Sequence, residues 1–306
     1  MKDKDLERMT VDKICHGIES MKIRGAALIA RAAALAMAKH VEEFDGDDLK
    51  EFKKWLKLGE EKLLSTRPTA VSLANALKYV LRAKGGDVES LKSSLKQRSY
   101  DFIESSHQAG LKIAKYGGKR IVDGDTILTH CNSSLALSAI EHAWGQGKKI
   151  EVIATESRPK RQGYITVRYL AERSIPVTLI VDSAVRYIMQ KVDKVYLGAD
   201  TVTSNGAVIN KIGTSQIALC AHEARVPVSV CGETYKFSQD TLFGDLVKIE
   251  EREPSEIVDP SDFPGVKIKN PVFDATPAEY IDVIITELGV ISPSSAYRVI
   301  DDVLAE

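Results

Sequence analysis

The chain contains 306 residues, 44% of them hydrophobic and 28% charged, which is the composition of an ordinary soluble globular protein. This composition excludes an intrinsically disordered chain, a collagen-like repeat and a disulfide scaffold. Lys and Arg together number 42 and Asp and Glu 43, so the formal net charge is −1, whereas a dedicated nucleic-acid-binding protein usually carries a basic excess.

The first part of the chain has a helical pattern throughout. Ala26–His40 is rich in Ala, Leu and Met, which are strong helix formers. Apolar residues recur at intervals of three to four in Asp48–Leu64 and in Asp87–Tyr116, which indicates amphipathic helices. A further helix is predicted over Pro68–Arg82, since Pro is common at the first helical position. We therefore expect an all-helical domain over residues 1–120.

The pattern changes after residue 125, where short runs rich in Val and Ile predict strands. These runs are Thr126–Thr129, Ile150–Thr155, Val177–Val181, Lys194–Leu197, Val226–Val230 and Val283–Thr286. Helical segments separate most of them, namely Ser134–Trp144, Ile165–Arg173, Ala184–Gln190 and Ser215–Ala224. Glu250–Pro264, which is dense in acids and prolines, is predicted as a surface loop.

Continuous apolar strands that alternate with helices are typical of a parallel sheet with helices on both faces. The predicted fold class is therefore α/β, with an N-terminal all-helical domain over residues 1–120 and a Rossmann-like parallel-sheet domain over residues 121–306. A chain of this length is expected to form about two domains. The sequence contains neither a G-x-G-x-x-G motif after its first strand nor a P-loop, so a dinucleotide enzyme or a nucleotide triphosphatase lacks its main signal.

The cysteines and the apolar runs predict the compartment. The four cysteines show no Cys-x-x-Cys pair and no zinc-like spacing, and free thiols in a chain of this size are typical of a reducing compartment. Residues 2–5 are all charged, and no apolar stretch follows them, which predicts no signal peptide. No apolar run reaches the roughly 18 residues that a membrane-spanning helix needs. We therefore expect a cytoplasmic protein without a membrane partner.

A thiol and a carboxylate follow two strands of the predicted sheet. Cys131 comes directly after the first strand, and Asp200 follows the fourth in Gly198-Ala199-Asp200. Ligands of open parallel sheets bind beyond the carboxyl ends of the strands, so these two groups could relay protons between a carbon and an oxygen atom of a ligand. The alternatives are that Cys131 is a buried structural residue and that Asp200 caps a helix.

Four segments have features of an anion-binding site, because a helix start with a cation, hydroxyls and accessible backbone N–H groups suits a phosphate. They are Arg24–Ala27 at the start of the Ala-rich helix, Arg67 before Pro68, Asn205–Ser215 with Lys211, and Lys236. For the Lys211 segment the alternative is a Gly turn with a Thr or Ser helix cap and an exposed Lys. Four such segments in a chain without net positive charge favour a ligand with more than one phosphate.

Eight segments, spread over nearly the whole chain, match the motifs of a known family. They are Lys22–Ala26, Thr66–Leu73, Thr129–Ser133, Thr155–Pro159, Gly198–Asp200, Asn210–Thr214, Glu233–Phe237 and Asn270–Asp274. On these residues the chain resembles the ribose-1,5-bisphosphate isomerases of archaeal nucleotide salvage. Their superfamily also holds the methylthioribose-1-phosphate isomerases and the alpha, beta and delta subunits of translation initiation factor two-B.

The resemblance implies the conversion of α-D-ribose 1,5-bisphosphate to D-ribulose 1,5-bisphosphate in AMP salvage, with no metal and no other cofactor. It implies that Cys131 and Asp200 are the catalytic pair. The substrate contacts that it implies are Arg24, Gly25, Ala26, Ala27, Arg67, Asn210, Lys211 and Lys236. The expected partners are this sugar bisphosphate and further copies of the chain, since the family forms dimers that associate into hexamers, and no nucleic acid is expected.

The hypothesis for the mechanism follows from the phosphate on the C1 oxygen, which prevents the sugar from opening to a free aldehyde. Asp200 would protonate the ring oxygen, and Cys131 would remove the C2 proton and return it to C1 through an enol phosphate. Asp200 must then carry a proton at neutral pH, which burial away from cations favours. Cys131 needs a polar or cationic setting that favours its thiolate.

Two alternatives from the same superfamily remain open. A methylthioribose-1-phosphate isomerase would use the same pair on a substrate with a thioether end, and Asn132 resembles that branch more closely. The four cations listed above instead favour two phosphates. A non-catalytic translation-factor subunit would bind protein partners and would share Asn210–Thr214, but those subunits typically lack the Cys–Asp pair that this chain keeps.

Overall fold

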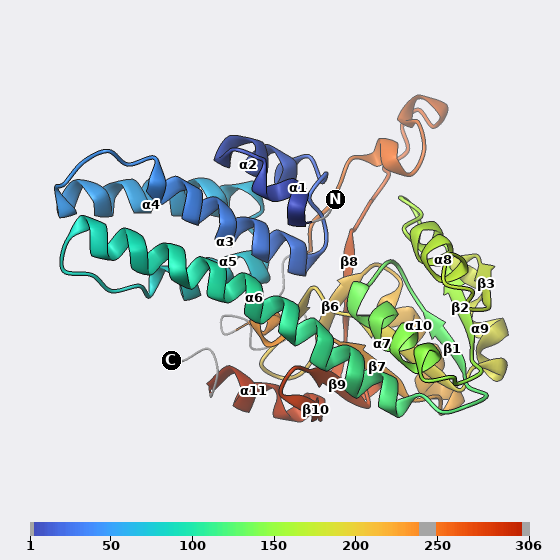
Figure 1. Ribbon diagram of the computed structural model, residues 1–306. Coiled ribbons are helices and arrows are strands. Elements are labelled where there is room, and N and C mark those ends of the chain that lie inside the picture. The colour runs from blue at the N-terminus through green and yellow to red at the C-terminus, as the bar shows by residue number, and fades with distance from the viewer. Residues whose placement is uncertain (1–2, 239–248, 302–306) are drawn as a thin grey trace. The chain divides into compact units, whose positions relative to one another are not determined.

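The computed structural model describes residues 3–238 and 249–301, and the chain divides into two compact units, Met1–Ala109 and Gly110–Glu306 (Figure 1). The division falls inside one long helix, α6 (Val88–Arg120). Within the described ranges, no helix combines the length and the apolar character needed to cross a membrane.

Unit 1 is helical and is organised around α3 (Ala26–Glu42). The other helices are α1 (Asp3–Glu7), α2 (Val11–Glu19), α4 (Leu49–Thr66), α5 (Val71–Leu81) and the first part of α6. α3 contacts α1, α2, α4 and α5, and its run of alanines is almost completely buried. Because alanine side chains are short, the neighbouring helices approach α3 closely. His40 of α3 stacks on Trp55 of α4 with their ring centroids 4.5 Å apart.

The predicted start of α5 at Pro68 is wrong. The backbone N–H of Ala70 donates to the carbonyl of Arg67 at 3.0 Å, so residues 67–70 form a turn and the helix begins at Val71. Pro also favours the second position of such a turn, because its fixed φ angle suits that position as well as the first position of a helix. The sequence pattern alone does not distinguish these two uses of Pro68.

Unit 2 contains a seven-stranded sheet in the order β10-β9-β7-β4-β1-β2-β3. All neighbouring strands pair in parallel except β10 with β9. The strands are β1 (Thr126–Thr129), β2 (Glu151–Thr155), β3 (Val177–Ile180), β4 (Lys194–Gly198), β7 (Val228–Cys231), β9 (Val283–Thr286) and β10 (Gly289–Ile291). The helices are α7 (Ser134–Gly145), α8 (Gly163–Ala171), α9 (Val185–Ile188), α10 (Thr214–Ala224) and α11 (Ala296–Val299).

Each face of this sheet has its own hydrophobic core. Successive residues of a strand point to opposite faces, so Ile127 and Tyr196 pack with α7 in one core. Leu128 and Val195 pack with α9 and α10 in the other core. The predicted fold, a mainly parallel sheet covered by helices on both faces, is confirmed.

A second sheet was not predicted. It is antiparallel, with the order β5-β6-β8, and consists of β5 (Thr201–Val202), β6 (Val208–Lys211) and β8 (Phe273–Thr276). The sequence pattern indicated only a turn before a helix at residues 205–215. Strands of two to four residues give little periodicity, and the partner of β6 lies about sixty residues further along the chain, which no local pattern can reveal.

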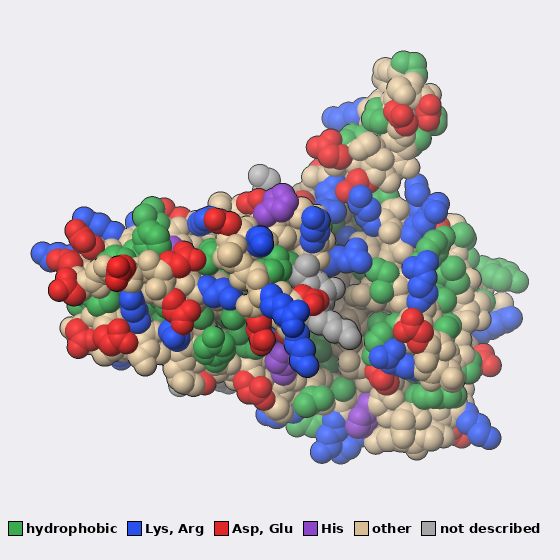
Figure 2. All heavy atoms as spheres, turned by 45° about the horizontal axis from the view of Figure 1, so that its top comes forward, with side chains coloured by type: hydrophobic (Ala, Val, Ile, Leu, Met, Phe, Trp, Pro, Cys, Tyr) green, Lys and Arg blue, Asp and Glu red, His purple; other side chains and the backbone are tan. Residues whose placement is uncertain are grey.

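Residues 250–264 form the predicted surface loop, which contains two short 3-10 turns, η5 (Pro254–Glu256) and η6 (Pro260–Asp262). The loop continues to residue 272, and its two ends are held together, since the Arg252 N–H donates to the Asn270 carbonyl at 3.0 Å and the Val272 N–H to the Glu250 carbonyl at 2.9 Å. Figure 2 shows the loop projecting from the surface with hydrophobic and acidic side chains on it.

The buried Tyr196 hydroxyl provides a test of the packing in unit 2. It donates to the Gly117 carbonyl of α6 at 2.9 Å, and the side chain is fully buried. We expect Tyr196→Phe to lower the free energy of unfolding by about 1–2 kcal/mol, because the hydrogen bond is lost inside the protein. Urea denaturation measures this change. Tyr100→Phe, at a side chain that is 52% exposed, is the control, and equal effects of the two variants would contradict the packing.

Candidate active site

The carboxyl ends of β1 and β4 lie next to each other at the point where the strand order reverses. From β1 the chain proceeds through β2 and β3 toward one edge, and from β4 it proceeds through β7 and β9 toward the other. Thr129 pairs with Tyr196, so Cys131 and Asp200 both follow the ends of this central pair. In open sheets such a switch point is the preferred place for a ligand.

Gly198 lets the end of β4 approach the segment that carries the thiol. A Cβ atom at Gly198 would lie 2.5 Å from the Ser133 hydroxyl, so only glycine fits there. Ser133 is two residues beyond Cys131, and its hydroxyl accepts the Ala136 N–H at 3.3 Å at the start of α7. Cys131 and Asp200 are both half-buried. The structure thus brings the Cys131 and Asp200 segments together beyond the carboxyl ends of β1 and β4.

The Cys131 backbone has an unusual conformation that polar neighbours hold. Its φ angle is +62°, in the left-handed region that non-glycine residues rarely adopt. Its N–H donates to the Ser157 hydroxyl at 2.7 Å, and its carbonyl accepts from the Thr166 hydroxyl at 2.7 Å. Of the four cysteines, all of which the structure describes, the other three are buried, and burial raises the pKa of each of those thiols. They are Cys15, Cys220 and Cys231.

The start of α10 differs from the predicted phosphate site. The Asp274 carboxylate accepts the Gly213 N–H at 2.7 Å and the Ser215 N–H at 3.2 Å, so the protein's own carboxylate already pairs with these backbone groups. Burial raises the pKa of Asp274 to about 6. Any substrate contact of this segment through Asn210 or Lys211 would therefore come from their side chains, not from the capped N–H groups.

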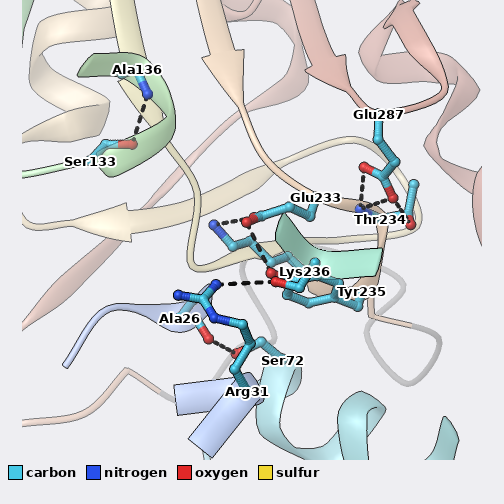
Figure 3. A network of polar contacts seen from close by, with 11 residues as sticks. Ala26, Arg31, Ser72, Ser133, Ala136, Glu233, Thr234, Tyr235, Lys236 and Glu287 are labelled. Carbon is cyan, nitrogen blue, oxygen red and sulfur yellow. Dashed lines mark hydrogen bonds and ion pairs between the residues drawn. The ribbon is translucent and has the colours of Figure 1, made fainter. Parts of the chain in front are cut away.

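Lys236 is also paired within the protein. Its ammonium lies 2.8 Å from a Glu233 carboxylate oxygen, and the two side chains are only 7% and 1% exposed. Figure 3 shows the Glu233 carboxylate between this ammonium and the Tyr235 hydroxyl, which donates to it at 2.9 Å. The sequence predicted a cation here, and the structure instead has a buried ion pair.

This pair lies beside the Asp200 segment. A Cβ atom at Gly232 would lie 3.3 Å from the Ala199 Cβ atom and 4.0 Å from the Lys236 Cδ atom. The Ser238 N–H donates to the Val202 carbonyl of β5 at 2.8 Å. Residues 232–238 therefore run alongside residues 199–202, so Lys236 and Asp200 belong to neighbouring segments.

The predicted contacts Arg24, Gly25, Ala26, Ala27 and Arg67 lie in unit 1, in two adjacent segments. Gly25, with φ +90°, precedes the first residue of α3, and the Ala26 carbonyl accepts from the Ser72 hydroxyl of α5 at 3.0 Å. The Arg67 guanidinium lies 3.3 Å from the Met21 sulfur atom. Arg24 is exposed, whereas Ala26 and Ala27 are half-buried.

Several residues that shape the site had no role in the sequence prediction. Ser157 and Thr166 hold the Cys131 backbone, Asp274 caps α10, and Glu233 neutralises Lys236. Ser157, Glu233 and Asp274 all lie within the segments that carry the family resemblance. The contacts that each of these residues makes depend on the fold, which no single motif reveals.

Comparisons with known proteins agree with the fold and identify the family. The sequence model described as the initiation factor 2 subunit family matches residues 22–293. A ribose 1,5-bisphosphate isomerase from Archaeoglobus fulgidus is 55% identical over 286 residues, which cover 93% of this chain and 90% of that protein. A putative methylthioribose-1-phosphate isomerase from the same organism is 37% identical, with coverage of 94% and 89%. The crystal structure of the translation initiation factor eIF-2B from Pyrococcus horikoshii matches with a TM-score of 0.81 at 32% identity, covering 92% of this chain and 97% of that one.

The Asp274 cap makes a pH-dependent contribution to stability. Because the folded-state pKa of about 6 lies above the ordinary value of 3.8, the folded protein binds this proton more tightly than the unfolded chain does. Acidification through about pH 6 should therefore stabilise the protein at this residue, by at most about 3 kcal/mol, and the gain is lost as the pH rises again.

Urea unfolding of the wild type and of Asp274→Asn over a series of pH values measures this contribution as the difference between the two proteins. The comparison is needed because burial lowers the pKa of His130, which gives the opposite pH dependence in both proteins. A difference that does not vary with pH would contradict the assignment.

Proposed function

The chain belongs to the initiation factor 2 subunit family, and we propose that within this family it is an aldose–ketose isomerase that converts α-D-ribose 1,5-bisphosphate to D-ribulose 1,5-bisphosphate. The observation that carries the proposal is a thiol and a carboxylate at the adjacent ends of β1 and β4, in a chain that is 55% identical to a protein named for this reaction. We propose that it acts in AMP salvage in the cytoplasm, as a homo-oligomer.

Asp200 is the proposed acid and Cys131 the proposed base. Asp200 gives its proton to the ring oxygen as the bond between that oxygen and C1 breaks, and the Cys131 thiolate removes the proton from C2. The product of these two steps is an enol phosphate with a double bond between C1 and C2. Cys131 then returns its proton to C1, and Asp200 regains a proton from the C2 hydroxyl as the ketone forms. Every proton that leaves the sugar or the enzyme is thereby accounted for.

The ion pair between Lys236 and Glu233 refines the proposed recognition of two phosphates. Lys236 is already neutralised by Glu233, so it contributes a net charge only if the substrate displaces or shares that carboxylate. In unit 2, the half-buried Lys211 is the proposed cation that a phosphate can reach without breaking that pair. In unit 1, the exposed Arg24 and the half-buried Arg67 remain proposed substrate contacts.

The closest alternative is methylthioribose-1-phosphate isomerase activity. The chain is 37% identical to the putative enzyme of that kind, against 55% for the ribose 1,5-bisphosphate isomerase from the same organism. A thioether end has no charge to pair with the cations that the bisphosphate would meet. The third candidate, a non-catalytic translation-factor subunit, is supported by the structural match at 32% identity, but it gives no use for Cys131 and Asp200.

Loss of either member of the pair tests the chemistry. Cys131→Ser and Asp200→Asn should each lower kcat by about a hundredfold to ten-thousandfold, because general acid–base catalysis contributes an effect of that size. Ketose formation from ribose 1,5-bisphosphate measures the rate, and the unfolding transition shows that each variant folds. Asp193→Asn is the matched control, since that carboxylate accepts the Thr126 N–H at the opposite end of β1. Activity close to that of the wild type in either test variant would reject the assignment.

The choice of substrate separates the two isomerases. Incubated with each sugar phosphate, the wild type should convert ribose 1,5-bisphosphate with a kcat/KM at least about a hundredfold higher than that for methylthioribose 1-phosphate, because a site built for a charged group rejects a substrate that lacks it. The opposite preference would assign the protein to the other branch. No turnover of either substrate, together with specific capture of initiation factor two, would support the translation-factor alternative.

A further inference from the structure

We infer that His130 is a positioning residue: through a chain of buried hydrogen bonds it connects the Cys131 backbone to the Asn210–Gly213 segment. The inference rests on the proposed function for the reaction that it serves. It concerns a side chain that was not among the predicted site residues and that does not need to touch the substrate.

The chain of contacts starts at the thiol-bearing residue. The Cys131 N–H donates to the Ser157 hydroxyl at 2.7 Å, and this hydroxyl lies 3.2 Å from the Thr155 hydroxyl. The Thr155 hydroxyl lies 2.6 Å from His130 Nδ1. His130 Nε2 lies 2.8 Å from the Ile212 carbonyl. Ser157, Thr155 and His130 are all at most 1% exposed, so water does not compete for these contacts.

The carbonyl acceptor at the far end, together with a neutral imidazole, fixes the direction of both His130 hydrogen bonds. A carbonyl oxygen only accepts, so His130 Nε2 must carry a hydrogen and donate to Ile212. In a neutral imidazole Nδ1 is then the acceptor, and the Thr155 hydroxyl donates to it. Burial lowers the pKa of His130, which agrees with this neutral form. The Ser157 hydroxyl, which accepts from Cys131, in turn donates onward to Thr155 or directly to His130 Nδ1, 3.2 Å away.

At its first end the chain holds a strained backbone. Cys131 and Ser157 both have left-handed φ angles, +62° and +60°, which non-glycine residues adopt only when their surroundings enforce them. The Asp182 carboxylate fixes Ser157, since it accepts the Ser157 N–H at 2.8 Å and the Arg158 N–H at 2.7 Å. The direction in which the thiol points therefore depends on where Ser157 and its partners lie.

At its other end the chain reaches a segment of proposed substrate contacts. Ile212 follows Lys211 directly, and the next residue, Gly213, has its N–H bound by Asp274. A Cβ atom at Gly213 would lie 3.2 Å from the His130 ring, so the ring packs closely against this backbone. A displacement of the Asn210–Gly213 segment would thus move His130 and, through Thr155 and Ser157, the Cys131 backbone.

A double-mutant cycle tests whether His130 and Ser157 act as one unit. His130→Asn keeps a polar group near the Nδ1 position but withdraws the donor to Ile212, and Ser157→Ala removes the acceptor for the Cys131 N–H. We expect each single variant to lower kcat by about tenfold to a hundredfold with KM little changed, because a misplaced reacting group costs about that much. We expect the double variant to be no slower than the slower single variant, since residues of one network are not additive.

Alkylation of Cys131 gives a second measurement that needs no substrate. The rate at which iodoacetamide modifies Cys131, followed by mass spectrometry across neutral and mildly alkaline pH, reports how the thiol is held. The buried Cys15, Cys220 and Cys231, with raised pKa values, should react much more slowly. We expect His130→Asn and Ser157→Ala to shift the pH profile of this rate in the same way. Thr286→Val, which removes a buried hydroxyl from β9, should leave the profile unchanged.

The outcomes separate this inference from the proposed function. The role of His130 is overturned if the loss of kcat in the double variant equals the product of the two single losses. It is also overturned if the alkylation profiles of both single variants are unchanged. Neither result affects the turnover of the bisphosphate by the wild type. If the wild type does not turn over the bisphosphate, the proposed function fails, and the alkylation profiles still decide whether the hydrogen-bond chain holds the Cys131 backbone.

If His130→Asn does not fold, Thr155→Val replaces it, because valine keeps the shape of threonine and removes only the hydroxyl. It should then shift the alkylation profile in the same direction as Ser157→Ala, and an unshifted profile overturns the inference.

Discussion

The parallel pairing of β1 with β4 is the constraint on which the candidate site depends. Because the chain leaves these two strands toward opposite edges of the sheet, the connections that follow them diverge from the gap between their carboxyl ends. Gly198 keeps that gap narrow, and Cys131 and Asp200 follow the two strand ends. The polar residues around them, from His130 to Asp274, hold the backbone in this arrangement.

The six parallel strands of the large sheet and most helices could be predicted from the sequence because their signals are local, whereas the antiparallel β10 was not predicted. The runs Thr126–Thr129 and Val283–Thr286 match β1 and β9 residue for residue, since buried parallel strands are continuously apolar. The start of α5 and the β5-β6-β8 sheet could not be predicted. One depends on a turn hydrogen bond at Arg67, and the other on a partner strand far along the chain.

The same limit applies to the site. The order of strands and residues was enough to place Cys131 and Asp200 at strand ends, but it treated Lys236 and the start of α10 as open to an anion. In the structure both positions already hold carboxylates, Glu233 and Asp274, which lie near them only because of the fold. Lys236 and the N–H groups at the start of α10 are thus already paired within the protein, and an anion that binds at either position has to displace the resident carboxylate.

The surface loop at residues 250–272 is closed at its base by the backbone bonds of Arg252 and Val272. Because the loop is closed at its base, a change in its length should not alter the geometry of the sheet beneath it. Extra residues at the tip add only a small entropic cost. The tip around Phe263 and Val266 is exposed. An affinity tag or a fluorescent label inserted there would leave the strands that carry the proposed chemistry in register, which makes this loop the natural attachment point for immobilising the protein.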